Sequence, residues 1–152
     1  SLIFGSKSQG GTPWYGNVYF EGSASGEMYR VNPAFIDILK AHGKYNDDVL
    51  QTVLSDNGSV RKLDFLTDHE KEVLLTAFEI NQISIIDTAS RRQQFICQGQ
   101  STNLFFAADE DEEYISYVHQ YAFEDENTKS LYYLRSKSGV QASKGGCESC
   151  ES

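Results

Sequence analysis

The amino-acid sequence contains little cysteine, proline or positive charge. Its 152 residues include three Cys, two Pro, one Met and one Trp, with 13 Lys and Arg against 22 Asp and Glu. The net charge of −9 disfavours general binding to nucleic acid, which requires clustered Lys and Arg, although backbone amides can still hold a small phosphate ligand. No apolar run approaches the ~20 residues of a membrane-spanning helix, and the first residues do not form a secretory signal. We therefore expect neither nucleic acid nor a membrane as a partner.

The three cysteines are unevenly distributed. Cys147 and Cys150 form a C-E-S-C segment within the last six residues, whereas Cys97 stands alone. An odd number of cysteines without a signal peptide favours a reducing, cytoplasmic setting. The small, polar, Gly-rich sequence from Ser136 onward predicts a flexible tail that carries the terminal pair. Two thiols at this spacing can close a redox-active disulfide, while zinc needs two more suitably spaced ligands, and two solvent thiols without a role are the remaining alternative. We expect no metal site, and we expect Cys97 to be a small buried hydrophobic residue.

Length and aromatic content predict one folded domain with a substantial core. Nine Tyr and nine Phe argue against a disordered chain. Short apolar and aromatic runs predict two extended segments between residues 14 and 29, with a turn at 22–26. Further strands are predicted over residues 95–107, where a polar stretch interrupts the apolar residues, and over residues 130–135. The Gly- and Ser-rich residues 1–13 are predicted to form a loop.

Two helices are predicted in the first half of the chain. The first begins at Asn32, because the following proline suits a first helical turn, and it ends near Gly43. The second is capped by Asn46 or Asp47, either of which has a side chain that can accept a hydrogen bond from the first turn. The turn-forming residues 56–59 follow it.

Two further helices are predicted downstream. Thr67 and Glu70 have the spacing of a capping box, and apolar residues then recur at helical intervals to about Ser90. Five consecutive acidic residues at 109–113 precede the last helix. Negative charge is favourable in a first turn, where the helix dipole is positive, so these acids need no catalytic role.

Other candidate residues are aromatic or basic. Tyr132 and Tyr133 are adjacent on a predicted strand, so spacing alone places one ring in the core and the other at the surface. The three histidines, His42, His69 and His119, have no metal-binding spacing and are expected to be surface or internally hydrogen-bonded residues.

Four motifs follow one another in a characteristic order. They are residues 14–19 with 26–32 (WYGNVY and GEMYRVN), residues 95–104 (FICQGQSTNL), residues 131–135 (LYYLR) and the terminal cysteine pair. This series resembles the C-terminal part of the large, catalytic subunit of class I ribonucleotide reductases, whose corresponding patterns are SNIY…GEF…VN, FIDQSQSLN, a Tyr-Tyr segment and a redox tail. The resemblance runs from about residue 12 to the end of the sequence.

The resemblance implies an α/β fold that forms the C-terminal portion of a ten-stranded α/β barrel. Residues 1–138 would complete the barrel, and residues 139–152 would form the flexible redox tail. The enzyme would convert ribonucleoside diphosphates to deoxyribonucleotides for DNA replication.

The resemblance also implies roles for individual residues. Tyr133 and then Tyr132 would relay oxidising equivalents from a radical-storing small subunit toward an active-site cysteine. This relay requires the two rings to be in contact, so we predict an irregular backbone or a strand end there, with ring centroids within about 7 Å. A phenol suits this task because it can lose an electron and a proton together, without leaving a buried charge. Cys147 and Cys150 would reduce the active-site disulfide that remains after turnover, and thioredoxin or glutaredoxin would then reduce them again.

Several family features are different or missing. Cys97 stands where the family has Asp, so no family role transfers to it. Residues 5–9 (GSKSQ) loosely follow the family's phosphate loop, which makes Ser6 and Ser8 candidate contacts to the substrate phosphate. The radical-bearing cysteine and the nucleotide-effector sites would belong to an upstream part of the subunit. The metal and tyrosyl-radical cofactor would belong to the small subunit, so no cofactor is expected on this chain.

We expect the chain to be inactive alone and to act in a hetero-oligomer. It would be either an expressed fragment or one of two separately encoded pieces of the large subunit. The alternative is a non-catalytic interaction module that kept the fold and lost the chemistry. Retention of both the tyrosine pair and the thiol tail favours the enzyme.

Overall fold

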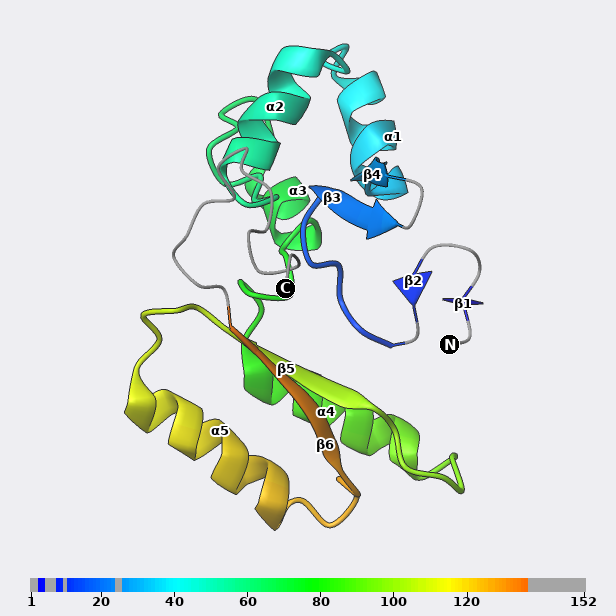
Figure 1. The fold of residues 1–152 in the computed structure, drawn as a ribbon, viewed down its shortest axis with the longest axis vertical. Coiled ribbons are helices and arrows are strands. Elements are labelled where there is room, and N and C mark those ends of the chain that lie inside the picture. Colours follow the sequence, from blue (N-terminus) through cyan, green and yellow to red (C-terminus); the bar gives the residue numbers. More distant parts are fainter. Residues whose placement is uncertain (1–2, 5–7, 10, 24–25, 137–152) are drawn as a thin grey trace, which may run out of the picture.

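The computed structural model describes residues 3–4, 8–9, 11–23 and 26–136, and it contains both helices and strands, as predicted. Figure 1 shows two halves, with α1, α2 and α3 in the first and α4, α5, β5 and β6 in the second. In chain order the elements are β1 (Ile3–Phe4), β2 (Ser8–Gln9), β3 (Val18–Ser23), β4 (Gly26–Val31), α1 (Pro33–Ala41), α2 (Asp47–Ser55), α3 (Asp68–Val73), α4 (Gln82–Gln93), β5 (Thr102–Phe106), α5 (Glu112–Glu124) and β6 (Leu131–Ser136).

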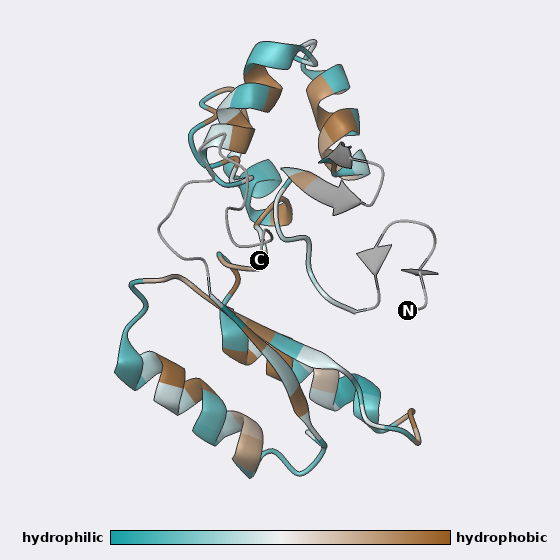
Figure 2. Ribbon diagram, viewed as in Figure 1, coloured by the Kyte–Doolittle hydropathy of each residue, from teal (hydrophilic) through white to brown (hydrophobic). Residues whose placement is uncertain are grey.

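The first half is a β-hairpin packed with short helices. β3 and β4 pair antiparallel, which confirms the two extended segments predicted between residues 14 and 29. The Asn32 side chain accepts a hydrogen bond from the Ala34 amide at the start of α1, and Asn46 does the same for Val49 at the start of α2. Figure 2 shows the hydrophobic residues of α1 and α2 on the sides that face each other. The core of this half is Val18, Phe35, Leu39, Leu50, Val53, Val60, Leu63, Leu66 and Leu74.

A buried asparagine joins three separate segments of this half. The Asn17 Nδ2 donates to the carbonyl oxygens of Gly58 and Leu74, at 3.1 and 2.7 Å, and its Oδ1 accepts from Asn32. Gly58 has a φ of 82°, and a Cβ there would lie 2.5 Å from the Gly16 Cα. Only glycine fits this turn, because the chain approaches too closely for a side chain. The segment before β3 is thereby fixed against the first core.

The second half is a βαβ unit with an additional helix. β5 and β6 pair in parallel and α5 connects them, while α4 packs on β5 and α5. Side chains alternate along β5: Leu104 and Phe106 join the core of α4 and α5, and Phe105 packs on the other face against Tyr15 and Phe78. The acidic first turn of α5 and the strand at 131–136 are as predicted.

The long helix predicted from Thr67 to about Ser90 is wrong, although its capping box with Glu70 is present. The structure has two helices, α3 and α4, separated by residues 74–81. Long-range hydrogen bonds explain the break, since the Ala77 amide donates to the Trp14 carbonyl at 2.7 Å. The Thr76 amide donates to the Glu79 side chain at 2.9 Å, so neither amide follows the helical pattern.

The strand predicted over residues 95–107 begins only at Thr102. Before it, glutamine side chains hold a loop. The Gln93 side-chain amide donates to the backbone carbonyls of Ile96 and Gln98, and the Gln100 side-chain amide donates to the backbone carbonyl of Ala89. These bonds replace the ladder that a strand would need.

The loop predicted over residues 1–13 is also partly wrong, because Ile3–Phe4 pairs antiparallel with Ser8–Gln9. Strands of two residues are too short to give a periodic signal in the sequence.

Candidate functional site: a tyrosine pair at a β-bulge

Tyr132 and Tyr133 lie at an irregularity in the parallel β5–β6 ladder. Thr102 pairs with Leu131 and Leu104 pairs with Leu134, so two residues of β6 lie opposite the single residue Asn103. This extra residue is a β-bulge, which interrupts the regular alternation of side chains along a strand. Two adjacent tyrosines can therefore lie on one face.

The two rings are in direct contact. Their centroids are 4.2 Å apart with an interplanar angle of 61°, and the two hydroxyl groups share a hydrogen bond, with 3.4 Å between their oxygens. An unbroken strand would have placed the rings on opposite faces. The relay implied by the resemblance required contact within about 7 Å at an irregular backbone, and this geometric prediction is confirmed.

The pair lies at the surface of the described chain. Tyr132 is 61% exposed and Tyr133 is 50% exposed. The hydrogen bond shared with Tyr133 raises the pKa of Tyr132 above its ordinary value of 10.0. Repulsion between the two groups, if both were ionised, and desolvation act in the same direction. Tyr132 is therefore a neutral phenol at physiological pH, which leaves its proton available for transfer with an electron.

Asn103 supports the bulge from the neighbouring strand. Its side-chain Oδ1 accepts a hydrogen bond from the Tyr133 amide at 3.2 Å. The bulge disrupts the backbone ladder at this point, and the asparagine side chain supplies an acceptor in place of a backbone carbonyl.

Arg135 lies beside the pair on the same strand. Its guanidinium carbon is 5.2 Å from the Tyr133 ring centroid and 5.4 Å from that of Tyr15. Tyr15 in turn contacts the buried Phe105, with 5.4 Å between centroids. The register explains this arrangement, because Arg135 pairs with Phe105 in the ladder and paired residues of neighbouring strands share a face.

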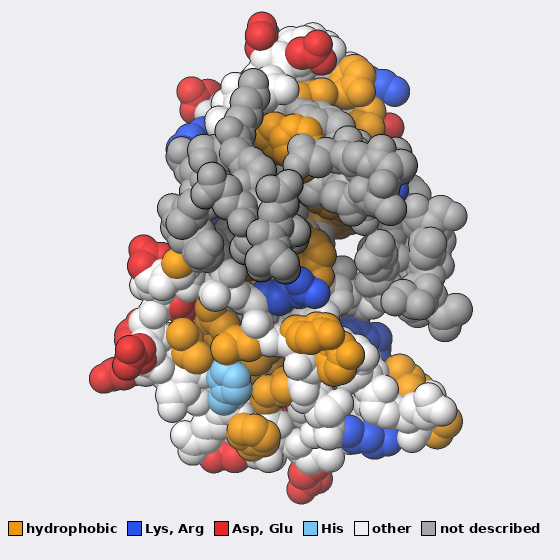
Figure 3. Space-filling view, viewed as in Figure 1, with side chains coloured by type: hydrophobic (Ala, Val, Ile, Leu, Met, Phe, Trp, Pro, Cys, Tyr) orange, Lys and Arg blue, Asp and Glu red, His pale blue; other side chains and the backbone are white. Residues whose placement is uncertain are grey.

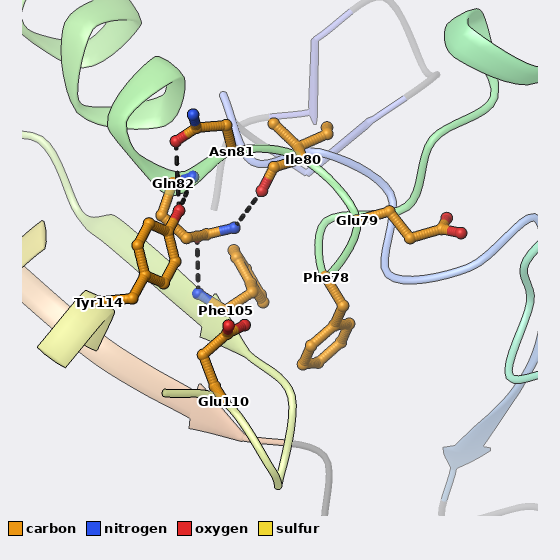
Figure 4. Close-up of a pocket in the computed structure, with 8 residues that line it drawn as sticks. All are labelled: Phe78, Glu79, Ile80, Asn81, Gln82, Phe105, Glu110 and Tyr114. Carbon is orange, nitrogen blue, oxygen red and sulfur yellow. Dashed lines mark hydrogen bonds between the residues drawn. The ribbon is translucent and has the colours of Figure 1, made fainter. Parts of the chain in front are cut away.

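A cavity of about 300 Å³ opens beside the start of α4 (Figure 4). The Gln82 amide donates to the carbonyls of Ala77 and Ile80, and its Oε1 accepts from the Phe105 amide at 2.8 Å. The Tyr114 hydroxyl accepts from the backbone N–H of Gln82 and donates to the Asn81 side-chain oxygen. These polar groups bind one another, so they fix α4 to β5 and α5 and do not form a free ligand site.

The other predicted site residues are less fully described. Ser6, Cys147 and Cys150 lie outside the described residues. Ser8 is described only as backbone, paired with Phe4 in the β1–β2 ladder. The phosphate contacts and the redox tail therefore stay predictions.

The prediction that Cys97 is buried is wrong, because the residue is exposed. It lies in the loop before β5, where its carbonyl accepts a hydrogen bond from Lys129 at 3.1 Å.

The histidines have structural surroundings. His69 is exposed in the first turn of α3, and the His119 Nδ1 lies 2.7 Å from the Ile115 carbonyl oxygen within α5. A hydrogen bond joins His42 to Glu70, with 2.8 Å between Nε2 and Oε1. This hydrogen bond is the largest influence that lowers the pKa of Glu70 from 4.5 to about 2.

The described part of the chain lacks two kinds of feature. Among these residues, no helix is both long and apolar enough for a membrane span. In the same residues, no three or more His, Cys, Asp or Glu side chains are grouped so as to hold a metal ion.

Comparison with known proteins identifies the family of this barrel-forming α/β chain. The family model for the ribonucleotide reductase barrel domain matches residues 1–134. The chain belongs to this family of ribonucleotide reductase barrel domains.

The similar proteins are large subunits of the same enzyme. A putative ribonucleoside-diphosphate reductase large subunit of Frog virus 3 is 37% identical over 127 residues, which are 84% of this chain and 22% of the relative. The ribonucleoside-diphosphate reductase large subunit of Invertebrate iridescent virus 6 is 36% identical over 148 residues, 95% of this chain and 15% of the relative. Among solved structures, the class Id ribonucleotide reductase alpha subunit of Actinobacillus ureae matches with a TM-score of 0.73 and 33% identity, over 84% of this chain and 22% of that one. The chain thus spans about a fifth or less of these relatives, and its fold is part of the reductase barrel.

Sequence reasoning assigned no role to three residues that surround the tyrosine pair: Tyr15, Asn103 and Arg135. The one available signal was an asparagine in an apolar strand, because Asn is disfavoured in strands unless its side chain has a partner. The contacts of Tyr15 and Arg135 depend on the strand register, which no local pattern indicates.

Proposed function

We propose that this chain is a C-terminal piece of a ribonucleoside-diphosphate reductase large subunit, which supplies the tyrosine pair for radical transfer and the dithiol that re-reduces the active site. The observation that carries the proposal is the β-bulge, which brings the Tyr132 and Tyr133 rings to 4.2 Å. A structural role alone would not require two adjacent, exposed tyrosines to share one face.

In the proposed relay, Tyr133 accepts the oxidising equivalent first. It loses one electron and its phenolic proton and becomes a neutral radical. Tyr132 then gives one electron and one proton to this radical, which restores the Tyr133 phenol and moves the radical to Tyr132. The 3.4 Å separation of the hydroxyl oxygens supports this step, because the proton can move between them while the electron moves between the contacting rings. Tyr132 would next take one electron and one proton from an active-site cysteine of the upstream part.

The proposed role of Cys147 and Cys150 is thiol–disulfide exchange. Their two thiols would give two electrons and two protons to the active-site disulfide, which becomes a dithiol while the pair becomes a disulfide. Thioredoxin or glutaredoxin would then reduce this disulfide by the same exchange. Thiol chemistry of this kind suits a reducing, cytoplasmic compartment.

The surface of the second half supports assembly with the upstream part. β6 is exposed along most of its length, including Leu134 at 57%. Two phenylalanines of the same half, Phe95 and Phe123, are 88% and 81% exposed. Figure 3 shows hydrophobic side chains gathered at the surface of this half. Parallel sheets are normally covered on both faces, and among the described residues only β5 pairs with β6. Further barrel strands from the upstream part would pair with the free edge and cover these side chains.

The remaining parts of the proposal concern the whole enzyme. The substrate is a ribonucleoside diphosphate, and Ser6 and Ser8 are candidate contacts to its phosphate. The metal and tyrosyl radical belong to the small subunit, and nucleotide effectors bind the upstream part. We propose the boundary between barrel and tail at residues 138 and 139.

Reconstitution tests the proposal. The chain, the upstream part of the large subunit and the radical-generating small subunit are purified separately, then mixed with a ribonucleoside diphosphate and a dithiol reductant. Deoxyribonucleotide should form only when all three are present. A complex of the chain with the upstream part that supports no reduction, under conditions where an intact relative is active, would contradict the proposal and favour the non-catalytic interaction module.

A further inference from the structure

Arg135 occupies a position between two aromatic rings that belong to different halves of the chain. Its guanidinium carbon lies 5.2 Å from the Tyr133 ring centroid and 5.4 Å from the Tyr15 ring centroid. Both distances are within the ~6 Å at which a cation is attracted to the face of an aromatic ring. The planar guanidinium can stack on rings, whereas the ammonium of lysine acts as a point charge.

The two rings are held to different degrees. Tyr15 is anchored: its ring contacts the buried Phe105, and the neighbouring Trp14 carbonyl accepts the hydrogen bond from Ala77. The Tyr133 ring is half exposed, and its other described ring contact is with Tyr132, which is itself 61% exposed. A rotation of the half-exposed Tyr133 side chain would separate its ring from that of Tyr132.

We propose that Arg135 is a positioning residue that links Tyr133 to the fixed Tyr15 ring and so holds Tyr133 against Tyr132. The importance of this link for turnover rests on the proposed radical-transfer function, but the link itself does not. Without it, the Tyr133 side chain populates rotamers in which the hydroxyl hydrogen bond to Tyr132 is broken. Arg135 takes no part in the proton or electron transfer.

The test uses 3-fluorotyrosine at position 133 in the reconstituted enzyme, observed by ¹⁹F NMR. The variants are Arg135→Met, which removes the cation but keeps an unbranched chain, Arg135→Lys, and Tyr15→Leu. Arg91→Met is the matched control, because Arg91 is exposed at the end of α4. Loss of a ring contact should change the ratio of Tyr133 rotamers, in contact with Tyr132 or turned away from it, by roughly two- to fivefold. This is the size expected for a cation–π contact at an exposed site.

The Arg135→Met and Tyr15→Leu variants should both move the ¹⁹F resonance toward its position in the unfolded chain. Their combination should move it no further than Arg135→Met alone, because the two residues act through one contact. Arg135→Lys should be intermediate, and Arg91→Met should resemble the parent enzyme. In turnover, kcat should fall most in Arg135→Met and Tyr15→Leu, less in Arg135→Lys and not at all in Arg91→Met. KM for the nucleotide should stay unchanged in all four variants.

Two outcomes separate this inference from the proposed function. If the resonance is unchanged in Arg135→Met and in Tyr15→Leu, the positioning role is refuted, and the radical-transfer proposal still stands. If the resonance moves as expected but turnover does not need the tyrosine hydroxyls, the positioning role stands and the radical-transfer proposal fails.

Discussion

The bulge that brings the two tyrosines together should depend on the side chain of Asn103. Replacement of Asn103 by Leu keeps the size of the side chain but removes the oxygen that accepts from the Tyr133 amide at 3.2 Å. The Tyr133 amide then has to bind water or stay unpaired. An intramolecular hydrogen bond contributes ~1 kcal/mol net, so opening of this amide should become easier by about that amount.

Hydrogen exchange measures this opening directly. A change of ~1 kcal/mol corresponds to about fivefold faster exchange of the Tyr133 amide in the reconstituted enzyme. Replacement by Asp is the matched control, because a carboxylate oxygen can accept the same hydrogen bond, and exchange should stay near the parent rate. Turnover of the Leu variant should fall by no more than the same factor, because the bulged register is weakened but not forbidden.

Two results would refute this reasoning. If exchange at Tyr133 is the same in the Leu variant and the parent, Asn103 does not hold the bulge. If the Asp variant exchanges as fast as the Leu variant, the acceptor oxygen is not the relevant feature of the side chain.

Three further predictions concern the thiols, the α1–α3 contact and assembly. Replacement of Cys147 and Cys150 by Ser should stop turnover driven by thioredoxin. Dithiothreitol should restore part of the turnover, because a small dithiol reaches the active-site disulfide directly. Full thioredoxin-driven turnover in the double variant would exclude the tail from the mechanism. His42→Ala should raise the pKa of Glu70 from about 2 toward 4.5, since the hydrogen bond from His42 is the largest cause of the lowering. Because its pKa is lowered, ionised Glu70 stabilises the fold above pH 4.5, and this stability is lost as the pH falls toward 2. The loss should become smaller in the variant. An unchanged midpoint for Glu70 in a ¹³C carboxyl NMR titration would show that His42 is not the cause of the lowered pKa. The chain expressed alone should aggregate or unfold without a sharp transition, because β6 lacks a second neighbouring strand among the described residues. A monodisperse monomer with cooperative melting would show that the chain folds without the upstream part.

The local signals in the sequence were sufficient for most helix starts, but not for the start of α4 at Gln82. Asn32 and Thr67 were expected to begin helices and do so. Asn46 and Asp47 were both candidates for the cap of α2, and the cap is Asn46. These signals are local because a cap bonds to amides only two or three residues away. The acidic first turn of α5 was predictable for the same reason, since the helix dipole acts within one turn.

Features that depend on distant contacts were not predictable from the sequence. The break between α3 and α4 is set by the Trp14 carbonyl and the Asn17 side chain, which bind Ala77 and Leu74 from more than fifty residues away in the chain. The exposure of Cys97 follows from a loop held by glutamine side chains, where the apolar residues nearby suggested a strand.

The candidate site was partly predictable. The resemblance to the reductase pointed to Tyr132 and Tyr133, and the alternation of a regular strand then required an irregular backbone for the rings to meet. The residues that produce this irregular arrangement, Asn103 and Arg135, act through the register of β5 and β6. That register is a property of the folded chain, so the sequence named the pair but not its supports.

The central claim is that the hydroxyl groups of Tyr132 and Tyr133 carry the radical to the active site. Tyr132→Phe and Tyr133→Phe each keep the ring and remove only the hydroxyl, so the 4.2 Å ring contact can persist while the proton path is lost. Tyr117→Phe, at an exposed position on α5, is the matched control. In the reconstituted reductase, each of the first two variants should assemble normally and form no deoxyribonucleotide above background, and the control should turn over like the parent. Normal turnover in either Tyr132→Phe or Tyr133→Phe would contradict the account.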